Sequence, residues 1–409
     1  MSIALGIDLC NDYTACRVFG TEDDEAISFP TVVCKNKKTG EWEIGEEAYR
    51  MALSGEGVIV DKLLKLAKKD GTATIDDIKY EASELLKIYL GKLIGVCLKK
   101  YGDDEISRLV VTIKELNKKL MDTIKDAGTA VGLSGGRIHI ISHTESFVYY
   151  VLSRPKELYN NQVALFDCSS YNLRYYEMKV IRGVKNVSVM AEGKSLEEAF
   201  NTDILKNEAG RRLADHILRS CAEKLMSKKI YSSVFLTGEA FNTGEWGEEF
   251  FKFICSRRRV GIEPGLFALG AAVRADDFNH GGVNFPYAVI CEGNLPVNIS
   301  MSVTAREQDT RLLLARAGDP WYETTGHVEL IPAGQDYVDI HIEAIDKEHR
   351  TRLIRIPLEG FPERPDRTTR IGLDISFPDA GKMEITINDM GFGELYPKSG
   401  AMIHEEIDL

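Results

Sequence analysis

The chain is organised around one stretch, Val163-Ala164-Leu165-Phe166-Asp167-Cys168-Ser169-Ser170-Tyr171-Asn172-Leu173-Arg174-Tyr175-Tyr176. An apolar run meets Asp167, small or polar residues follow, and an apolar and aromatic run returns, which predicts a strand, a tight turn and a second strand. An Asp at the end of a buried strand, facing backbone N–H groups, is where a fold can hold a metal-bound phosphate. Taken alone, the stretch is more simply read as an ordinary hairpin, and its turn contains no glycine.

The same pattern occurs at the start of the chain, about 160 residues earlier. An apolar run, 3–8, ends in Asp8, a polar turn covers 9–13, and a second strand is expected at 14–19. Further strands and helices then alternate as far as residue 278. Strands are predicted at 29–33, 109–113, 138–141, 184–191 and 231–236, and helices at 46–69, 75–101, 116–131, 142–152, 196–228 and 266–273. This alternation predicts an α/β layer architecture that is built twice.

The pattern changes after residue 278, where 279–282 reads as a linker. Apolar residues then alternate with polar ones at 338–342, 371–377 and 383–387, and 378–381 reads as a hairpin turn. We therefore predict an all-β sandwich over 283–395, followed by a C-terminal tail at 396–409.

Composition narrows the class of protein. The 409 residues predict two or three domains, and the net charge of −12 argues against a nucleic-acid surface. The N-terminus lacks the basic start of a signal peptide, and no window approaches eighteen apolar residues. The eight cysteines include no Cys-x-x-Cys pair, which argues against a disulfide framework or a zinc site. We expect a cytoplasmic protein with no membrane contact.

Several short motifs stand in a fixed order along the chain. They are 6–8, 111–113 with 125–128, 140–144, 166–170, 235–238 and 269–273. This order resembles the nucleotide-binding domain of the seventy-kilodalton heat-shock chaperones (the DnaK type), within the actin-like ATPase superfamily. The segments 358–360, 370–377, 379–381 and 383–389 resemble the last strands of that family's β-sandwich peptide-binding domain. The resemblance covers nearly the whole chain.

The resemblance implies a ribonuclease-H-like domain at 1–278, with lobes at about 1–160 and 161–278 that close on ATP or ADP with magnesium. It also implies a peptide or protein client for the sandwich. Asp8 and Asp167 match the acids of the two phosphate motifs and would act at the magnesium. Lys62 is the best match to a phosphate-contacting lysine, and Gly238 matches the glycine of the adenosine motif. The remaining candidate nucleotide-binding residues are Asn11, Asp12, Ser169 and Ser170.

The chain departs from the family at the phosphate-binding turns and at the catalytic positions. Neither phosphate turn has the family's glycines, and Asp12 adds a negative charge to the first. His143 stands at the position of the catalytic Glu, with Glu145 two residues further on, and Arg174 stands where a later Asp is expected. The span 167–238 is too short for the family's helical subdomain, and we expect neither the family's apolar inter-domain linker nor its helical lid.

Three hypotheses follow. The first is a degenerate chaperone-like protein that binds a peptide or protein partner and hydrolyses ATP weakly or not at all. The second is a working ATP-dependent chaperone in which Asp8, Asp167 and Glu145 hold magnesium and a water. The third is an actin-like structural or regulatory scaffold. A small-molecule kinase is disfavoured because the sandwich has no role in that chemistry. Residues 312–314 and Trp321 either line a peptide groove or belong to the sandwich core.

Overall fold

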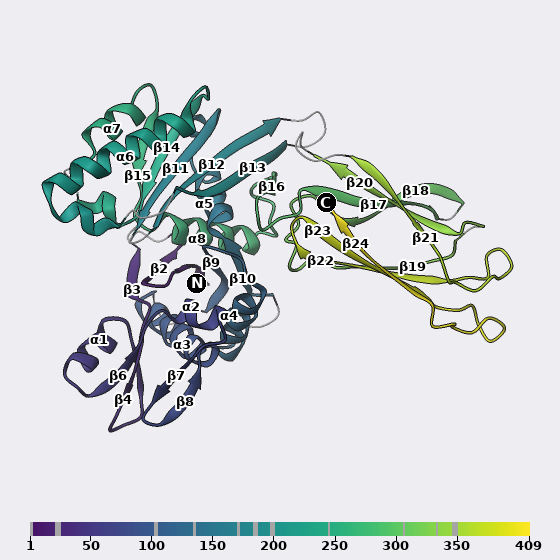
Figure 1. Cartoon of the computed structure of the whole chain (residues 1–409), viewed down its shortest axis with the longest axis horizontal. Coiled ribbons are helices and arrows are strands. Elements are labelled where there is room, and N and C mark those ends of the chain that lie inside the picture. Colours follow the sequence, from purple (N-terminus) through teal and green to yellow (C-terminus); the bar gives the residue numbers. More distant parts are fainter. Residues whose placement is uncertain are drawn as a thin grey trace. The chain divides into compact units, whose positions relative to one another are not determined.

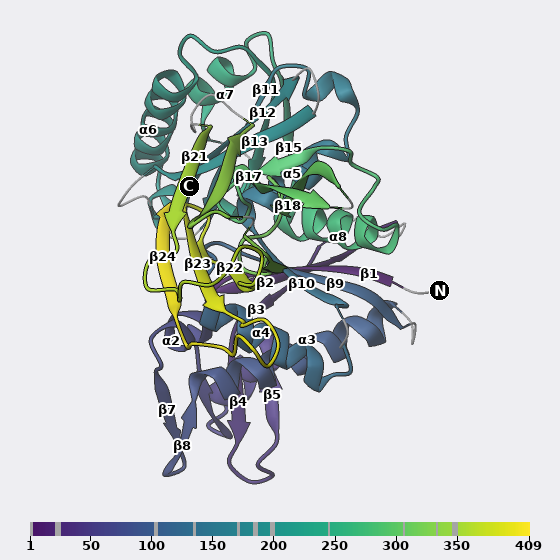
Figure 2. The same cartoon turned by 90° about the vertical axis from the view of Figure 1, so that its right-hand side faces the viewer.

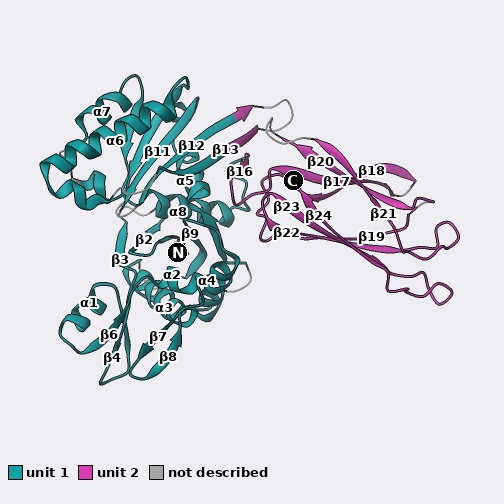
Figure 3. Cartoon of the chain, in the orientation of Figure 1, with its two compact units in different colours: residues 1–180, 191–286 teal, residues 181–190, 287–409 magenta. Residues whose placement is uncertain are grey.

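The computed structural model describes residues 3–20, 26–101, 105–133, 136–169, 172–182, 187–196, 201–243, 246–305, 307–332, 334–345 and 351–409. The chain divides into two compact units (Figure 3). Unit 1 comprises Met1–Val180 and Ala191–Pro286, and unit 2 comprises Ile181–Met190 and Tyr287–Leu409. The first unit therefore extends past the predicted end at residue 278, and a short segment of its second half is assigned to unit 2.

Unit 1 is an α/β unit with two main sheets (Figure 1). The first has the order β10-β9-β1-β2-β3, with β1 (Ile3–Leu9), β2 (Tyr13–Val18), β3 (Ile27–Pro30), β9 (Ile106–Ile113) and β10 (Ile138–Ser142). Strand β1 lies parallel to β9 and antiparallel to β2, and β9 lies parallel to β10. Six of the seven residues of β1 are buried, as expected of a central strand covered on both faces.

The second sheet of unit 1 repeats this plan. Its strands follow the order β15-β14-β11-β12-β13, with β11 (Gln162–Ser169), β12 (Asn172–Arg182), β13 (Val187–Ser195), β14 (Tyr231–Thr237) and β15 (Arg259–Ile262). Strand β11 lies parallel to β14 and antiparallel to β12, just as β1 lies to β9 and β2. Both predicted strand pairs are confirmed, the turn residues 170 and 171 lie outside the described residues, and the α/β layer occurs twice.

Helices α3 to α8 also fall into two matching sets. After the first three strands come α3 (Ala82–Tyr101), α4 (Lys118–Ala130) and α5 (His143–Leu152), and after the second three come α6 (Glu208–Met226), α7 (Glu248–Ile254) and α8 (Leu266–Asn279). Helix α5 begins where predicted, because the Ser142 side chain accepts the Glu145 backbone N–H at 3.0 Å. Gly132, with φ +88°, follows the end of α4 as expected.

Helix α8 lies between the two sheets of unit 1 (Figures 1 and 2). A Cβ added to Gly6 of β1 would come within 2.2 Å of the Ala268 carbonyl oxygen. A Cβ added to Gly270 would come within 2.0 Å of the Ser146 carbonyl oxygen of α5. Main chains therefore touch directly at both places, and α8 holds the end of β1 close to the start of α5.

An insertion between β3 and α3 differs from the predicted helices. It contains β4 (Val33–Asn36), β5 (Trp42–Ile44), α1 (Gly45–Leu53), β6 (Gly57–Val60), α2 (Leu63–Lys68), β7 (Thr72–Ile75) and β8 (Ile78–Glu81). The prediction of a single helix at 46–69 was wrong, because β6 pairs with β4 and separates two short helices. The helix predicted within 75–101 is confirmed as α3, which begins at residue 82, after the β7–β8 hairpin.

Other predicted boundaries also moved. The strand expected at 29–33 is divided between β3 and β4. The helix expected at 196–228 is a 3₁₀ turn, Thr202–Lys206, followed by α6, and residues 197–200 lie outside the described part of the chain.

Unit 2 is built of strands. One sheet has the order β18-β17-β20-β21, with β17 (Val297–Ala305), β18 (Gln308–Ala315), β20 (Tyr337–Ala344) and β21 (Arg352–Pro357). The other has the order β19-β22-β23-β24, with β19 (Gly326–Leu330), β22 (Ile371–Asp379), β23 (Lys382–Asp389) and β24 (Met402–Asp408). The short strand β16 (Ala288–Ile290) pairs with residues 188–190 of β13. The predicted alternation is confirmed, since the apolar residues of β20, β22 and β23 are buried.

The C-terminal segment is not a tail, which corrects the prediction for 396–409. Strand β24 pairs antiparallel with β23. Buried Asp389 holds the connecting loop, because its carboxylate accepts hydrogen bonds from Arg364 and from the backbone N–H groups of Gly391 and Ser399. Within the described residues, no helix is long and apolar enough to cross a membrane.

Candidate functional site

The candidate site lies in unit 1, where the carboxyl ends of its central strands meet the start of α5. Asp8 comes near the end of β1, Lys114 directly follows β9, His143 is the first residue of α5, and Asp167 comes near the end of β11. The carboxyl ends of parallel strands in α/β folds are where ligands usually bind. The structure thus brings together both acids that the sequence predicted, with His143 between them in chain order.

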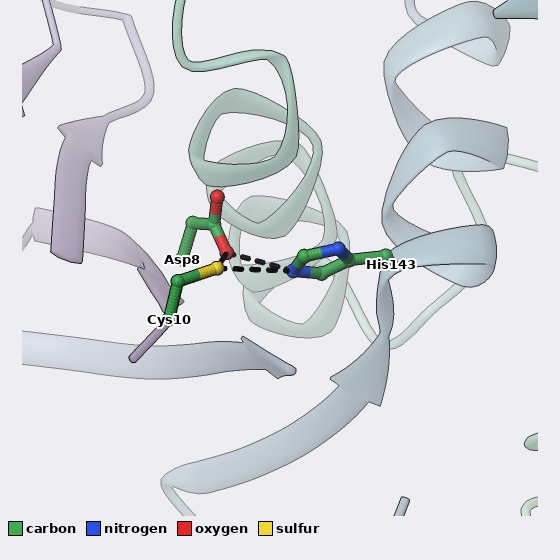
Figure 4. A group of neighbouring side chains, drawn as sticks. All are labelled: Asp8, Cys10 and His143. Carbon is green, nitrogen blue, oxygen red and sulfur yellow. Dashed lines mark hydrogen bonds and ion pairs between the residues drawn. The ribbon is translucent and has the colours of Figure 1, made fainter. Parts of the chain in front are cut away.

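Asp8 is held by two side chains (Figure 4). Its Oδ1 lies 2.8 Å from His143 Nε2 and accepts a hydrogen bond from Cys10 Sγ at 3.4 Å. Cys10 Sγ also lies 3.9 Å from the same nitrogen. The His143 ring is 3% exposed and stacks on Phe267 of α8, with ring centres 4.1 Å apart. This stacking fixes the direction of Nε2 toward Asp8.

Asp167 is held by a second set of donors. Ser169 Oγ donates to one carboxylate oxygen and Asn172 Nδ2 to the other, each at 2.7 Å. Lys114 Nζ in turn donates to the Asn172 side-chain oxygen. Burial raises the pKa of Asp167 to about 6, against the opposing effect of the hydrogen bond from Ser169.

Two cations lie next to these groups. Burial and the charge of Arg174 lower the pKa of Lys114. Arg174 stands opposite Asp167 in the β11–β12 pair, and its guanidinium lies over the Tyr176 ring at 5.5 Å from the ring centre. The site therefore contains positive side chains of its own beside the two acids.

The other predicted residues have structural roles or lie outside the description. Asn11 accepts the Lys65 backbone N–H at 3.0 Å and so caps the start of α2. Lys62 precedes that helix with φ +52° and is exposed, as is Asp12. Ser170 lies outside the described residues.

Gly238 is explained by chain packing. A Cβ at this residue would come within 2.4 Å of the Cys168 carbonyl oxygen, so the backbone of Gly238 approaches β11 closely. Its φ of +100° is a second reason for glycine at this position. The close approach that the sequence assigned to a nucleotide is thus made to the protein's own main chain.

Glu145, two residues after His143, lies in α5. Its side chain is buried and interacts electrostatically with Arg274 of α8. Sequence reasoning did not nominate Cys10, Lys114 or Asn172. Lys114 carried a usable signal, because it directly follows the predicted strand 109–113, the parallel neighbour of β1.

The geometry does not suit nucleophilic catalysis by Cys10. Burial, with the negative charges of Asp8 and Asp167, raises the pKa of its thiol well above the usual value, so the unreactive protonated form is favoured. Asp8 and Cys10 also both lie near Nε2 of His143. A catalytic triad instead needs the nucleophile at one ring nitrogen and the acid at the other. The other nitrogen, Nδ1, is buried with no partner among the described residues.

Two family models match the chain. Residues 15–292 match the family described as Family of unknown function (DUF5716) C-terminal. The chain belongs to this family. Residues 294–409 match a second description, Domain of unknown function (DUF8552). The change from one match to the other falls a few residues after Pro286, where unit 1 ends.

The raised pKa of Asp167 makes a prediction about stability and pH. The pKa of Asp167 is about 6 in the folded state and 3.8 when unfolded. The free energy of unfolding of the native chain therefore falls as the pH rises between these values. Replacing Asp167 by Asn removes this penalty. We expect the free energy of unfolding of Asp167→Asn, relative to the native chain, to increase by roughly 1 kcal/mol between pH 5 and pH 7.5. Urea unfolding at both pH values measures the difference, and a difference that does not change with pH would contradict the assigned burial.

Proposed function

We propose that this chain is a chaperone-like protein that binds a peptide or protein, with an actin-like α/β unit whose nucleotide site is degenerate. The duplicated α/β plan supports this architecture, since a two-lobed actin-like ATPase needs two related halves. The β-rich unit 2 supports the resemblance to a chaperone's peptide-binding domain.

One observation carries the proposed loss of catalysis. Both acids expected to act at magnesium have side-chain partners within the protein, Asp8 with His143 and Asp167 with Ser169 and Asn172. A metal-bound nucleotide needs these carboxylate oxygens, directly or through water, and would have to displace those contacts. Lys114 already supplies positive charge beside Asp167, where the metal would supply it.

The surroundings of the acids also fit magnesium–ATP poorly. Asn11 caps α2, and Gly238 approaches Cys168, so neither is presented as a phosphate or adenosine contact. His143, which the resemblance puts at the position of the catalytic Glu, lies within hydrogen-bonding distance of Asp8. The residues present therefore support a scaffold more than an enzyme.

For unit 2 we propose that the partner contacts the edge strand β18. Among the described residues, β18 is an edge strand of its sheet, and away from Leu314, whose carbonyl oxygen lies close to Gly326 of β19, its outer backbone groups can accept an extended peptide. Leu313 on this strand is 42% exposed, whereas Trp321 is buried and its indole N–H donates to the Glu292 carbonyl at 3.0 Å. Trp321 thus belongs to the interior, and Leu313 is the better candidate contact.

Nucleotide assays test the degenerate site. We expect no magnesium-dependent phosphate release above a protein-free blank at millimolar ATP, whether or not ATP shifts the melting temperature. A heat-denatured sample and Asp8→Ala serve as controls. Robust turnover that disappears in Asp8→Ala would overturn the proposal and favour the working ATP-dependent chaperone.

Peptide binding tests the partner site. A library of extended apolar peptides, with fluorescence anisotropy as the readout, should yield binders whose affinity falls about tenfold or more in Leu313→Glu, a loss of ~1.4 kcal/mol. Leu353→Glu is the matched control, because Leu353 is 52% exposed on β21 at the other edge of the same sheet. Equal affinities of the two variants, or no binder in the library, would count against β18.

A further inference from the structure

We propose that Asp8, Cys10 and His143 form a binding site for a divalent d-block cation, zinc(II) first of all. Within the described residues, these three present ligand atoms that all lie within 4.8 Å of one another. The inference goes beyond the proposed function and does not depend on it, because it rests only on this group.

The separations of the three ligand atoms fit one metal ion. Tetrahedral zinc with ordinary bond lengths places its ligand atoms ~3.3 Å apart for N and O, ~3.5 Å for S and O, and ~3.6 Å for S and N. The corresponding distances here are 2.8, 3.4 and 3.9 Å. Each differs from the ideal by less than about 0.6 Å, so small side-chain shifts are enough to close the site.

The ligands are placed by rigid parts of the fold (Figure 4). Asp8 belongs to β1, Cys10 follows it in the turn, and His143 is the first residue of α5. The stack on Phe267 holds the imidazole with Nε2 directed at the other two ligands. Little conformational freedom is therefore lost when a metal binds, which favours affinity.

The kinds of ligand select the metal. Magnesium prefers six oxygen ligands, whereas thiolate and imidazole favour zinc and its d-block neighbours. Three protein ligands leave one tetrahedral position for water or for an exchangeable ligand, as in catalytic zinc sites. The chemical class of the cofactor is thus a borderline-to-soft divalent cation.

Metal binding at this site is balanced in charge and in protons. The bound site contains the Asp8 carboxylate, the Cys10 thiolate and neutral His143, whose two negative charges are matched by the cation. The thiol loses its proton to solvent, and so does His143 if it is protonated before binding, so metal uptake releases one or two protons. No oxidation or reduction is involved.

Cobalt(II) is the probe that tests the site. The full chain, stripped with a chelator and kept reduced, is titrated with cobalt chloride and then with zinc chloride. We expect one equivalent of cobalt to produce a near-ultraviolet thiolate-to-cobalt band that zinc abolishes. The band should be lost in Cys10→Ser and unchanged in Cys255→Ser, which removes an exposed cysteine.

Two further variants keep the result decisive. If Cys10→Ser does not fold, as judged by circular dichroism, His143→Gln and Asp8→Asn retain the thiol and should weaken cobalt binding at least about tenfold. No thiolate band in the native chain, or an undiminished band in folded Cys10→Ser, would overturn the proposal. Because the readout needs no nucleotide, its failure is separate from failure of the ATP assays.

Discussion

The direct contact of main chains at α8 is the constraint on which the rest of unit 1 depends. Gly6 of β1 and Gly270 of α8 leave no room for a side chain, so the central strand of the first sheet, α5 and α8 pack backbone to backbone. The end of β1 and the first residue of α5 are thereby brought within hydrogen-bonding distance. A Cβ at either glycine would push apart the elements that carry Asp8 and His143. These two residues are 135 positions apart in the chain.

The site built on this contact balances its own charges. Two acids at strand ends can bind a metal ion together with its phosphates. Here, however, each acid has polar side-chain partners from the same chain. Partly buried carboxylates are costly when unpaired, so these partners stabilise the fold without any ligand. The same grouping around Asp8 contains a thiol and an imidazole, which is why a softer cation, and not magnesium, is the metal that suits it.

Much of this fold could be predicted from the sequence, because strand periodicity, the Asp-turn pattern at Asp8 and Asp167, and the Ser142 cap are local signals. The β6 strand and the β7–β8 hairpin were not predicted. Short strands contain few alternations of apolar and polar residues, and neighbouring leucines with helical spacing then favour the prediction of a helix. Strand β24 was missed because only Ile407 of its residues is buried. The contact of Asp8 with His143 could not be predicted from spacing, since the two residues are 135 positions apart and α8 packs against both of their elements.

The central claim is that the contact between His143 and Asp8 stabilises the folded chain. A double-mutant cycle with Asp8→Asn, His143→Gln and the double variant measures this pair directly, by urea unfolding with a chelator present so that no metal contributes. The account predicts a coupling of about 1–3 kcal/mol between the two substitutions. Effects that add to within about 0.5 kcal/mol would show that the two side chains do not stabilise one another, and would contradict the account.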